Sequence, residues 1–283
     1  WSSDVCSSDL SEASCRDAVP EAWHALGIRR WGFHGASHKF IAERSAELLG
    51  RPEVAARVRD LYVGGPGAAV AEPPLRVISC HLGGSSSISG IRNGIALGNS
   101  LGMSPQSGLP HNNRVGDLDA FALPYLVRSA GVSLDEAERI LCRESGLKGL
   151  SGISNDVRDL VGQAAEGNGR AQLALDVYVH QIRHWIGAYY LELNGLDALV
   201  FTAGIGENQW RVRQAVCQGL DQLGIRLDAA LNERQRATEG AIGAAGGPVR
   251  ILVIPTNEEL VVAREVKRHL ENNPNHQSTS NLK

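Results

Sequence analysis

The feature that most constrains the fold is a strand pattern interrupted by small residues at positions 76–90, RVISCHLGGSSSISG. The apolar pattern of a buried strand leads into His81, two glycines and three serines, and it resumes at Ile88. Glycine lets the backbone approach an anion and adopt positive φ, while serine adds hydroxyl donors without bulk. The pattern predicts either a loop that surrounds a phosphate with donors or an ordinary hairpin with a polar turn.

A second segment favours the phosphate interpretation. Residues 196–201 have the pattern of another buried strand, residues 202–208 (TAGIGEN) form a glycine-rich turn, and a helical stretch begins near Trp210 and runs to Leu220. The N-terminus of a helix after such a turn is a natural site for an anion or a nucleotide. The sequence has no P-loop motif, and this turn carries no full dinucleotide fingerprint. A nucleotide fold of another kind is therefore predicted.

Composition narrows the class of protein. A chain of 283 residues that is 43% hydrophobic can build one large domain or two small ones. The net charge of −3 and the lack of a dense Lys/Arg run argue against nucleic acids and acidic membranes as partners, which leaves small molecules or a second copy. Five scattered cysteines without metal-ligand spacing predict a reducing, cytoplasmic setting. The sequence contains neither an apolar run of about 20 residues nor a signal-peptide pattern.

The rest of the chain alternates helical and strand patterns, which predicts an α/β fold. The expected elements are helices at 41–49 and 53–61, a Gly/Pro-rich linker at 64–74, a long loop at 99–113, a helix opened by the capping box at 133–136 and ending near 145, a long amphipathic helix at 171–193, a strand at 249–254, and a last helix capped by 256–259 and ending near 270. From position 272 the chain is polar, and we expect disorder there.

Two motifs suggest chemistries that their surroundings do not favour. Residues 98–102 (GNSLG) match the nucleophile elbow of serine hydrolases with Ser100 as nucleophile, but Pro105 and Gly108 break the helix that this elbow requires. His34 and His38 have the spacing of a zinc pair, but Gly35 disfavours a helix and no glutamate follows the first histidine. His34 then remains either an electrostatic or hydrogen-bonding residue or a structural histidine.

Three further positions have both a functional and an ordinary interpretation. Arg114 ends the long loop and can clamp carboxylate or phosphoryl oxygens, or it can form surface ion pairs with Asp117 and Asp119. Residues 156–158 (DVR) can border a nucleotide or form a solvated turn. Glu258 can bind Mg²⁺ directly or through water, or it can be a favourable charge in a first helical turn.

Together these motifs resemble the acetate/propionate kinase (acetokinase) family, which belongs to the actin-like ATPase superfold of sugar kinases, Hsp70 and actin. The matching segments are residues 30–38 (RWGFHGASH), 80–83 (CHLG), 113–119 (NRVGDLD), 144–147 (ESGL), 154–159 (SNDVRD), 201–208 (FTAGIGEN) and 255–260 (PTNEEL). They keep the order of the family over roughly residues 20 to 270. So many ordered matches are far more specific than any one motif.

The resemblance implies reversible, Mg²⁺-dependent transfer of a phosphoryl group from ATP to a short-chain carboxylate such as acetate or propionate, by a homodimer. It implies that His34 and Arg114 stabilise the transferring phosphoryl group and that Glu258 helps to hold Mg²⁺. The residues that it assigns to ATP or ADP are His81, Leu82, Gly83, Gly84 and Ser85 at the phosphates, and Asp156, Val157, Arg158, Gly204, Ile205, Gly206, Glu207 and Asn208 at the adenosine side.

The sequence also departs from the family pattern around these sites. The family loop HLGNGAS is HLGGSSS here, so that Gly84 and Ser85 stand in place of Asn and Gly. The family's DTS and TPLEG segments correspond to GNS at 98–100 and SPQSG at 104–108, and Asn112 and Asn113 precede Arg114 where Gly and Thr are common. These changes flank both sites, so the sequence leaves the acyl-chain preference open.

Some family features are missing from the 283 residues. The first phosphate hairpin of the family (NAGSSSLK), a substrate-binding arginine and a catalytic aspartate are not found. Residues 1–10 look like a translated sequencing adapter. We expect an artefact at 1–10, the second domain of the family at 11–258, a helix returning to the first domain at 259–271 and a disordered tail at 272–283. Such a fragment is expected to bind adenine nucleotide weakly without turnover. The alternatives are a non-catalytic nucleotide-binding or dimerisation module and a serine hydrolase using Ser100.

Overall fold

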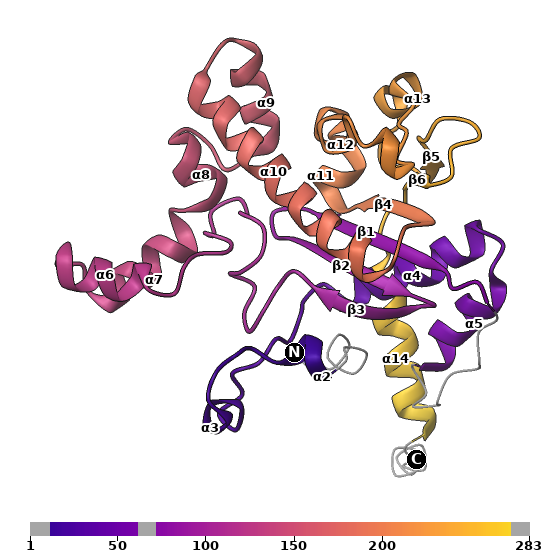
Figure 1. Cartoon of the computed structure of the whole chain (residues 1–283), viewed down its shortest axis with the longest axis horizontal. Helices are drawn as coiled ribbons and strands as arrows, with labels where there is room; N and C mark the ends of the chain where they lie inside the picture. Colours follow the sequence, from indigo (N-terminus) through magenta and orange to yellow (C-terminus); the bar gives the residue numbers. More distant parts are fainter. Residues whose placement is uncertain (1–11, 62–71, 273–283) are drawn as a thin grey trace, which may run out of the picture.

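A six-stranded mixed sheet with helices on both faces forms the centre of the molecule (Figure 1). The computed structural model describes residues 12–61 and 72–272. The strands are β1 (Arg76–Leu82), β2 (Ser86–Arg92), β3 (Ile95–Asn99), β4 (Ala198–Thr202), β5 (Gly240–Ala241) and β6 (Arg250–Val253). Their order is β3-β2-β1-β4-β6-β5, in which β1, β4 and β6 are parallel and the other neighbours pair antiparallel. The carboxyl ends of β1 and β4 therefore meet at one edge of the sheet, where α/β proteins commonly bind ligands.

The helices flank this sheet and extend beyond it. They are α2 (Glu12–Cys15), α3 (Glu21–His24), α4 (Gly35–Leu48), α5 (Pro52–Leu61), α6 (Ala122–Ser129), α7 (Leu134–Arg143), α8 (Gly146–Ser151), α9 (Val157–Ala165), α10 (Gly169–Glu192), α11 (Ala203–Asn208), α12 (Trp210–Cys217), the 3₁₀ turn η1 (Asp221–Leu223), α13 (Ala229–Arg234) and α14 (Glu258–Asn272). Helices α6 and α7 extend away from the sheet, while α4, α5 and α14 lie together on the side opposite α10 (Figure 1).

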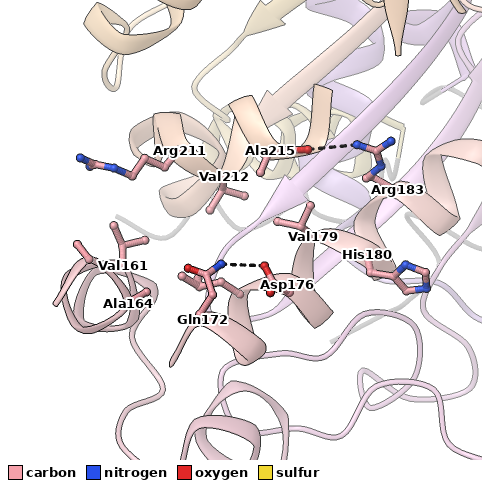
Figure 2. A pocket seen from close by; sticks show the side chains of 12 residues that line it. Val161, Ala164, Gln172, Asp176, Val179, His180, Arg183, Arg211, Val212 and Ala215 are labelled. Atoms are coloured by element: carbon pink, nitrogen blue, oxygen red, sulfur yellow. Dashed lines mark hydrogen bonds between the residues drawn. The ribbon is translucent and has the colours of Figure 1, made fainter. Parts of the chain in front are cut away.

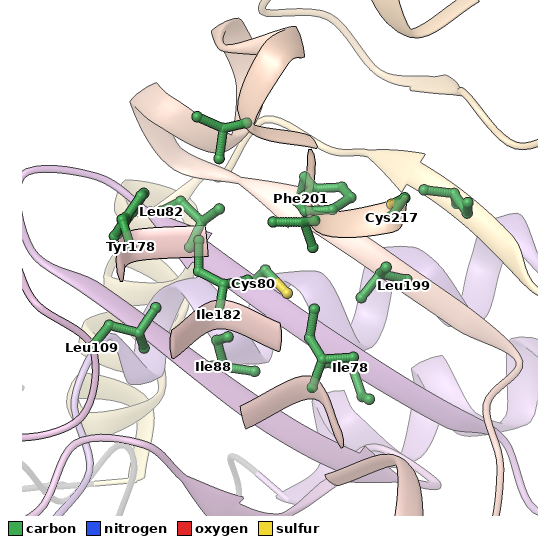
Figure 3. Close-up of a cluster of buried hydrophobic side chains, with 14 of the residues drawn as sticks. Ile78, Cys80, Leu82, Ile88, Leu109, Tyr178, Ile182, Leu199, Phe201 and Cys217 are labelled. Atoms are coloured by element: carbon green, nitrogen blue, oxygen red, sulfur yellow. The ribbon is translucent and has the colours of Figure 1, made fainter. Parts of the chain in front are cut away.

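Strand periodicity divides the core into two layers. Alternate residues of β1, including Ile78, Cys80 and Leu82, join one apolar cluster with Phe201 of β4 and with Ile182 of α10 (Figure 3). The residues between them face the other side, where α4 and α5 contribute a second cluster. This two-residue alternation is the pattern of a sheet covered on both faces.

Two glycines bring the long helix α10 close to the sheet. A Cβ at Gly90 of β2 would lie 2.7–2.9 Å from the Cβ, Cγ and Cδ1 atoms of Tyr189. A Cβ at Gly98 of β3 would lie 2.9 Å from Cε1 and 3.0 Å from the hydroxyl oxygen of the same tyrosine. Tyr189 is 3% exposed, so its ring occupies the space that side chains at these positions would need. Glycine is therefore required here for packing.

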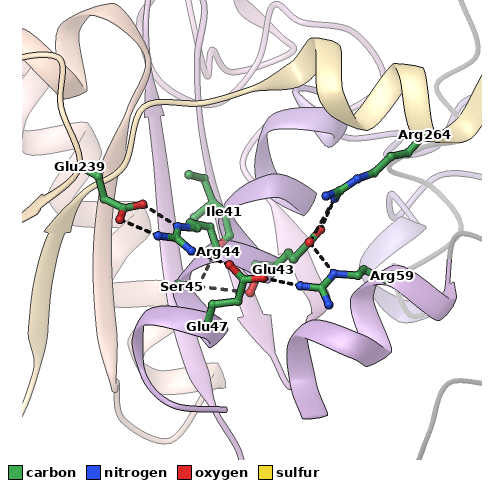
Figure 4. Close-up of polar contacts among 9 residues, drawn as sticks. Ile41, Glu43, Arg44, Ser45, Glu47, Arg59, Glu239 and Arg264 are labelled. Atoms are coloured by element: carbon green, nitrogen blue, oxygen red, sulfur yellow. Dashed lines mark hydrogen bonds and ion pairs between the residues drawn. The ribbon is translucent and has the colours of Figure 1, made fainter. Parts of the chain in front are cut away.

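A charged cluster joins α4, α5 and the C-terminal helix α14 (Figure 4). Glu43 of α4 is buried, and its carboxylate accepts hydrogen bonds from Arg59 Nε at 2.7 Å and from Arg264 Nη1 at 2.8 Å. Lys39 and Glu265 form a second ion pair between α4 and α14 at 3.3 Å. These contacts fasten α14 to the helix that carries His34 at its start.

Most predicted elements are present, and several boundaries differ. The strands at 76–82 and 198–202, the helices at 53–61 and 171–193, and the strand at 249–254 are confirmed to within a few residues. The helix predicted at 41–49 begins at Gly35, so the expectation that Gly35 disfavours a helix was wrong. A glycine costs little at a helix start, and the burial of Ser37 and Ile41 against the sheet outweighs that cost.

Capping also differs in detail. Ser133 accepts from Glu136 N at 3.2 Å and caps α7 as predicted. The last helix is capped by Asn257, whose Oδ1 accepts from Leu260 N, whereas Thr256 donates its hydroxyl to Ser37. The adapter-like residues 1–10, most of the linker at 64–74 and the tail after 272 lie outside the described residues.

Candidate functional site

Two stacked histidines form one corner of the candidate site at the carboxyl end of β1. The rings of His34, which precedes α4, and His81 lie 3.9 Å apart and are tilted by only 14°. Ser87 Oγ lies 2.8 Å from His34 Nδ1, and Ser37 Oγ lies 2.9 Å from His81 Nδ1. His34 has φ 62° and ψ 33°, a left-handed conformation that turns its side chain toward the strand.

Burial makes these imidazoles poor bases. Desolvation is the main cause that lowers the pKa of His34 from its ordinary value to about 2, and repulsion from Arg114 and from the protonated forms of His81 and His111 adds to it. Desolvation also lowers the pKa of His81 to about 3 and that of His111 to about 4. Both stacked rings are therefore neutral at pH 7 and act as hydrogen-bond donors and acceptors rather than as cations.

Arg114, which the resemblance assigns to the transferring phosphoryl group, lies beside this corner. Its Nη1 donates to Ser85 Oγ at 3.2 Å and to the Pro105 carbonyl at 3.3 Å. The loop around it is fixed by His111, whose Nδ1 accepts from Ser86 N at 2.8 Å. The ion pairs with Asp117 and Asp119 that formed the alternative interpretation are not seen among residues 72–272. A fixed cation thus lies next to two neutral imidazoles.

A cavity of about 380 Å³ adjoins this corner and collects most of the residues predicted to bind nucleotide. Four separate segments line it, contributing Gly83, Gly84, Asn112, Asp156, Val157, Arg158, Gly204, Ile205, Asn208 and Gln209. Asp156 caps α9 by accepting from Arg158 N, and hydrogen bonds from the Arg158 side chain lower the pKa of Asp156. The volume lies in the range of small-molecule sites in proteins.

A buried arginine holds the segment at 203–208 in place. The guanidinium of Arg213 donates to the carbonyls of Gly206 and Glu207 at 2.8 Å, to both oxygen types of Asn232 and to the Gln235 carbonyl. Arg213 is fully buried, and desolvation lowers its pKa to about 10. The bonds to 206 and 207 explain how α11 keeps its shape beside the cavity.

Not every predicted residue points into the cavity. Leu82 is buried in the apolar core, and Gly206 packs against the backbone of Phe201 and Cys80. Glu207 is half-buried and accepts from Thr256 N at 3.4 Å; desolvation raises its pKa. Leu82 and Gly206 were predicted to bind nucleotide because they belong to the matching motifs, but in the structure both serve packing.

The candidate Mg²⁺ residue is exposed at the start of α14. Partial desolvation raises the pKa of Glu258, and the described residues contain no group of three or more His, Cys, Asp or Glu side chains that could hold a metal ion. The spacing of His34 and His38 accordingly does not make a zinc site, because His38 bonds to Ser79 and Ser87.

Ser100 is fully buried, and its Oγ accepts from Ile88 N at 2.9 Å. Within residues 72–272 and 12–61 no histidine hydrogen-bonds to it. The structure gives this serine a role in joining the chain after β3 to β2, which disfavours the hydrolase interpretation.

Sequence reasoning missed the residues that support the site from behind. Asn112 and Gln209 line the cavity, and Ser37, His38 and Thr256 hydrogen-bond around the histidines. All five lie in or beside the motifs quoted above, and this position in the sequence could have indicated that they are near the site. Spacing in the sequence does not show which group a hydroxyl bonds to, so their hydrogen bonds could not be predicted.

A second cavity of about 480 Å³ lies among α9, α10 and α12 (Figure 2). Its walls are mainly apolar, with Val161, Val179 and Val212, while Asp176 and Arg183 stand at its rim. Arg183 is committed to the carbonyls of Ala215 and Gln218. The cavity shares α9 with the first one but none of its lining residues. In the portion of the chain that the structure covers, no helix is long and apolar enough to cross a membrane.

Comparison with known proteins gives a consistent result. The sequence profile of the acetokinase family matches residues 7–264. The acetate kinase of Geobacillus kaustophilus is 44% identical over 260 residues, which cover 92% of this chain and 61% of that protein. Among solved structures, the acetate kinase of Porphyromonas gingivalis matches with a TM-score of 0.82 and 34% identity, over 94% of this chain and 62% of that one.

A propionate kinase from Francisella tularensis matches with a TM-score of 0.79 and 31% identity, over 93% of this chain and 62% of that one. The predicted fold class, the actin-like ATPase superfold as these kinases adopt it, is thereby confirmed. The chain spans about three fifths of the length of the curated relatives that it matches.

Proposed function

Because this chain belongs to the acetokinase family, we propose that it takes part in reversible phosphoryl transfer from ATP to a short-chain carboxylate, acetate or propionate, with an acyl phosphate as product. The observation that carries the proposal is the convergence of four separate segments on one cavity beside the stacked histidines and Arg114. Phosphoryl transfer depends on positioning and charge neutralisation more than on covalent catalysis, and this arrangement suits it.

The cavity fits the polar outline of a nucleotide. Asn112, which lines it, has a buried Oδ1 without a hydrogen-bond partner, so an acceptor awaits a donor there. A Cβ at Gly204 would meet nothing within 4 Å, so the wall at this point is open backbone. In the proposal, residues 156–158 and 204–208 hold the adenosine side and residues 81–85 the phosphates.

The stacked corner would receive the transferring group. A neutral His34 can donate one hydrogen bond to a phosphoryl oxygen, and Arg114 can neutralise charge that develops on it. Both groups are already oriented, His34 by Ser87 and Arg114 by Ser85. Such preorganised donors stabilise a transition state without having to move.

When bound together with the nucleotide, Mg²⁺ would neutralise phosphate charge. The protein offers it the exposed carboxylate of Glu258, and Mg²⁺ commonly binds one or two carboxylates together with phosphates and water. This donor set fits a metal that arrives with the nucleotide rather than a resident ion.

We also propose that the 283 residues alone bind nucleotide but form little acyl phosphate. None of the causes that lower the pKa of His34 is a carboxylate: they are desolvation and the charges of His81, His111 and Arg114. The family's first hairpin, arginine and aspartate are not among the residues of the sequence. Formation of acyl phosphate, trapped as a hydroxamate, at a rate typical of kinases would refute this part.

A homodimer is the proposed assembly, and α6 is the candidate contact. This helix buries none of its residues, and Tyr125 within it and Phe121 just before it are 68% and 80% exposed; Leu134 at the start of α7 is exposed as well. Apolar surface of this kind commonly marks an interface. Sedimentation should give a dimer for the natural sequence and a monomer for Tyr125→Asp. If nucleotide does not bind but the dimer forms, the dimerisation-module alternative is favoured. We propose a cytoplasmic location from the scattered cysteines.

Filling the cavity tests the nucleotide site directly. Gly204→Leu places a side chain into open space beside the cavity, and ADP affinity measured by calorimetry should fall at least about tenfold. Gly162→Leu is the matched control, because Gly162 is also an exposed helical glycine with open space but lies outside the cavity. Equal ADP affinity in both variants would contradict the site.

A further inference from the structure

A continuous hydrogen-bonded chain runs from the sheet to His34. Ser79 Oγ on β1 lies 2.9 Å from His38 Nδ1, His38 Nε2 lies 2.7 Å from Ser87 Oγ on β2, and Ser87 Oγ lies 2.8 Å from His34 Nδ1. Ser79 and Ser87 are fully buried and His38 is 4% exposed. Water therefore has little access to the links of this chain.

Burial also fixes the charge state of its members. Desolvation lowers the pKa of His38 to about 3, with a further effect from His34. The imidazoles of His34 and His38 are both neutral at pH 7, so each carries a single ring proton, on either Nδ1 or Nε2. Which nitrogen carries it is set by the bonds that the other nitrogen makes.

The two possible directions of the chain are not equivalent. If Ser79 donates to His38 Nδ1, then His38 carries its proton on Nε2 and donates to Ser87, and Ser87 donates to His34 Nδ1. Every buried donor then has an acceptor. In the reverse direction the hydroxyl proton of Ser79 has no acceptor among the described residues, because His38 is its only side-chain partner there. An unpaired buried donor is costly, so the first direction is favoured.

We infer that Ser79, His38 and Ser87 act as a tautomer relay that keeps the proton of His34 on Nε2. The Nε2 atom of His34 has no partner in the part of the chain that is described, and it is not among the buried unpaired atoms, so solvent or a ligand can reach it. Resting on the proposed function, this relay turns a neutral histidine into a donor aimed at a phosphoryl oxygen. His38 is thereby a positioning residue.

A second, independent chain of hydrogen bonds acts on His81, the ring stacked on His34, and favours the same tautomer. Thr256 Oγ1 donates to Ser37 Oγ at 2.9 Å, which leaves the Ser37 hydroxyl to donate to His81 Nδ1. His81 then also carries its proton on Nε2. The two parallel rings thus present two N–H donors, and neither needs to become a cation.

The relay can be tested without any nucleotide. Two-bond ¹H–¹⁵N correlation on the 283-residue chain labelled with ¹⁵N-histidine distinguishes protonated from unprotonated ring nitrogens, and His34→Gln assigns the signals. At pH 7, His34 should show Nε2–H in about tenfold or greater excess over Nδ1–H. A wild-type His34 that carries its proton on Nδ1 would overturn the inference.

Serine variants separate the relay from a merely structural role. Ser79→Ala and Ser87→Ala should both raise the Nδ1–H share of His34 several-fold, and Ser87→Thr, which keeps the hydroxyl, should restore the wild-type spectrum. Ser89→Ala is the matched control, because Ser89 is a buried serine on the same strand whose hydroxyl donates to Gly98 O instead. An unchanged His34 tautomer in both Ser79→Ala and Ser87→Ala would refute the relay.

The same samples separate this inference from the proposed function. If wild-type His34 has the stated tautomer but ADP fails to bind, the relay stands and the kinase proposal fails. If ADP binds but the tautomer is unaffected by the serine variants, the relay alone fails.

Discussion

Mild acid should unfold this protein through its buried histidines. His34, His38, His81 and His111 have pKa values lowered by burial to about 2, 3, 3 and 4. In the unfolded chain each returns to its ordinary value near 6.5. Below that pH the unfolded state binds more protons than the folded state, so stability falls as pH falls, and the loss continues until the pH reaches the folded values.

The size of the effect follows from proton linkage. Between pH 7.0 and 5.5 one such group costs about 1.3 kcal/mol, so four groups cost about 5 kcal/mol. That is a large part of the 5–15 kcal/mol that holds a typical domain together. Glu207 and Glu258, whose pKa values are raised by desolvation, act in the opposite direction, but carboxyl groups titrate mostly below this window.

Urea unfolding at pH 7.0 and 5.5 measures this difference. His38→Asn should reduce the pH-dependent loss by about a quarter, or roughly 1.3 kcal/mol, because one titrating group is removed. His180→Gln, which changes an exposed histidine outside the cluster, should leave the loss unchanged. A wild-type difference below about 1 kcal/mol would refute the premise that these rings are desolvated.

Other contacts give simpler predictions, each measured by urea unfolding. Gly90→Ala should cost about 1–3 kcal/mol because its Cβ meets the ring stem of Tyr189, whereas Gly187→Ala on the same helix as Tyr189 has open space and should stabilise by about 0.5–1 kcal/mol; equal effects would contradict the packing argument. Glu43→Gln should cost about 2 kcal/mol, since Arg264 loses its carboxylate and Arg59 keeps only Glu47, an effect that is partly offset by the exposure of both arginines; a neutral effect would mean that the Glu43 ion pairs do not contribute to holding α14. Arg213→Lys should cost about 2–4 kcal/mol and also weaken ADP binding, because three donors cannot replace five around α11 and α13; unchanged stability would show that these bonds are dispensable.

Periodicity and turn chemistry predicted the sheet and the approximate position of the edge at which the candidate site lies. The alternation of side chains between the two faces of β1 and the small-residue turn after His81 are local properties, so the sequence alone can predict them. The start of α4 was missed because burial of its first turn overrode the low helix propensity of Gly35. Local preference cannot report such tertiary compensation.

The candidate site was predicted less evenly. One cavity is lined by many of the residues that the motifs assigned to nucleotide, namely residues 83, 84, 156–158, 204, 205 and 208. For these residues, motif membership was enough to predict that they lie together. Leu82 and Gly206 belong to the same motifs, but the side chain of the first and the lack of one at the second serve packing. The hydrogen bonds of Ser79, Ser87 and Thr256 depend on which hydroxyl meets which ring across the fold, and no spacing rule encodes that.

The left-handed backbone at His34 has a consequence for anyone who tries to engineer this protein. In the left-handed region that His34 occupies, a residue with a Cβ has a conformational energy about 1–2 kcal/mol less favourable than in the right-handed region, whereas glycine has almost no such penalty. For the backbone alone, glycine is thus the favoured residue here, and it is the one that deletes the ring with its contacts to His81 and Ser87. If His34 holds the transferring phosphoryl group as proposed, selection for heat resistance and selection for turnover would favour different residues at this position, and a library sorted only for thermal stability would lose the histidine.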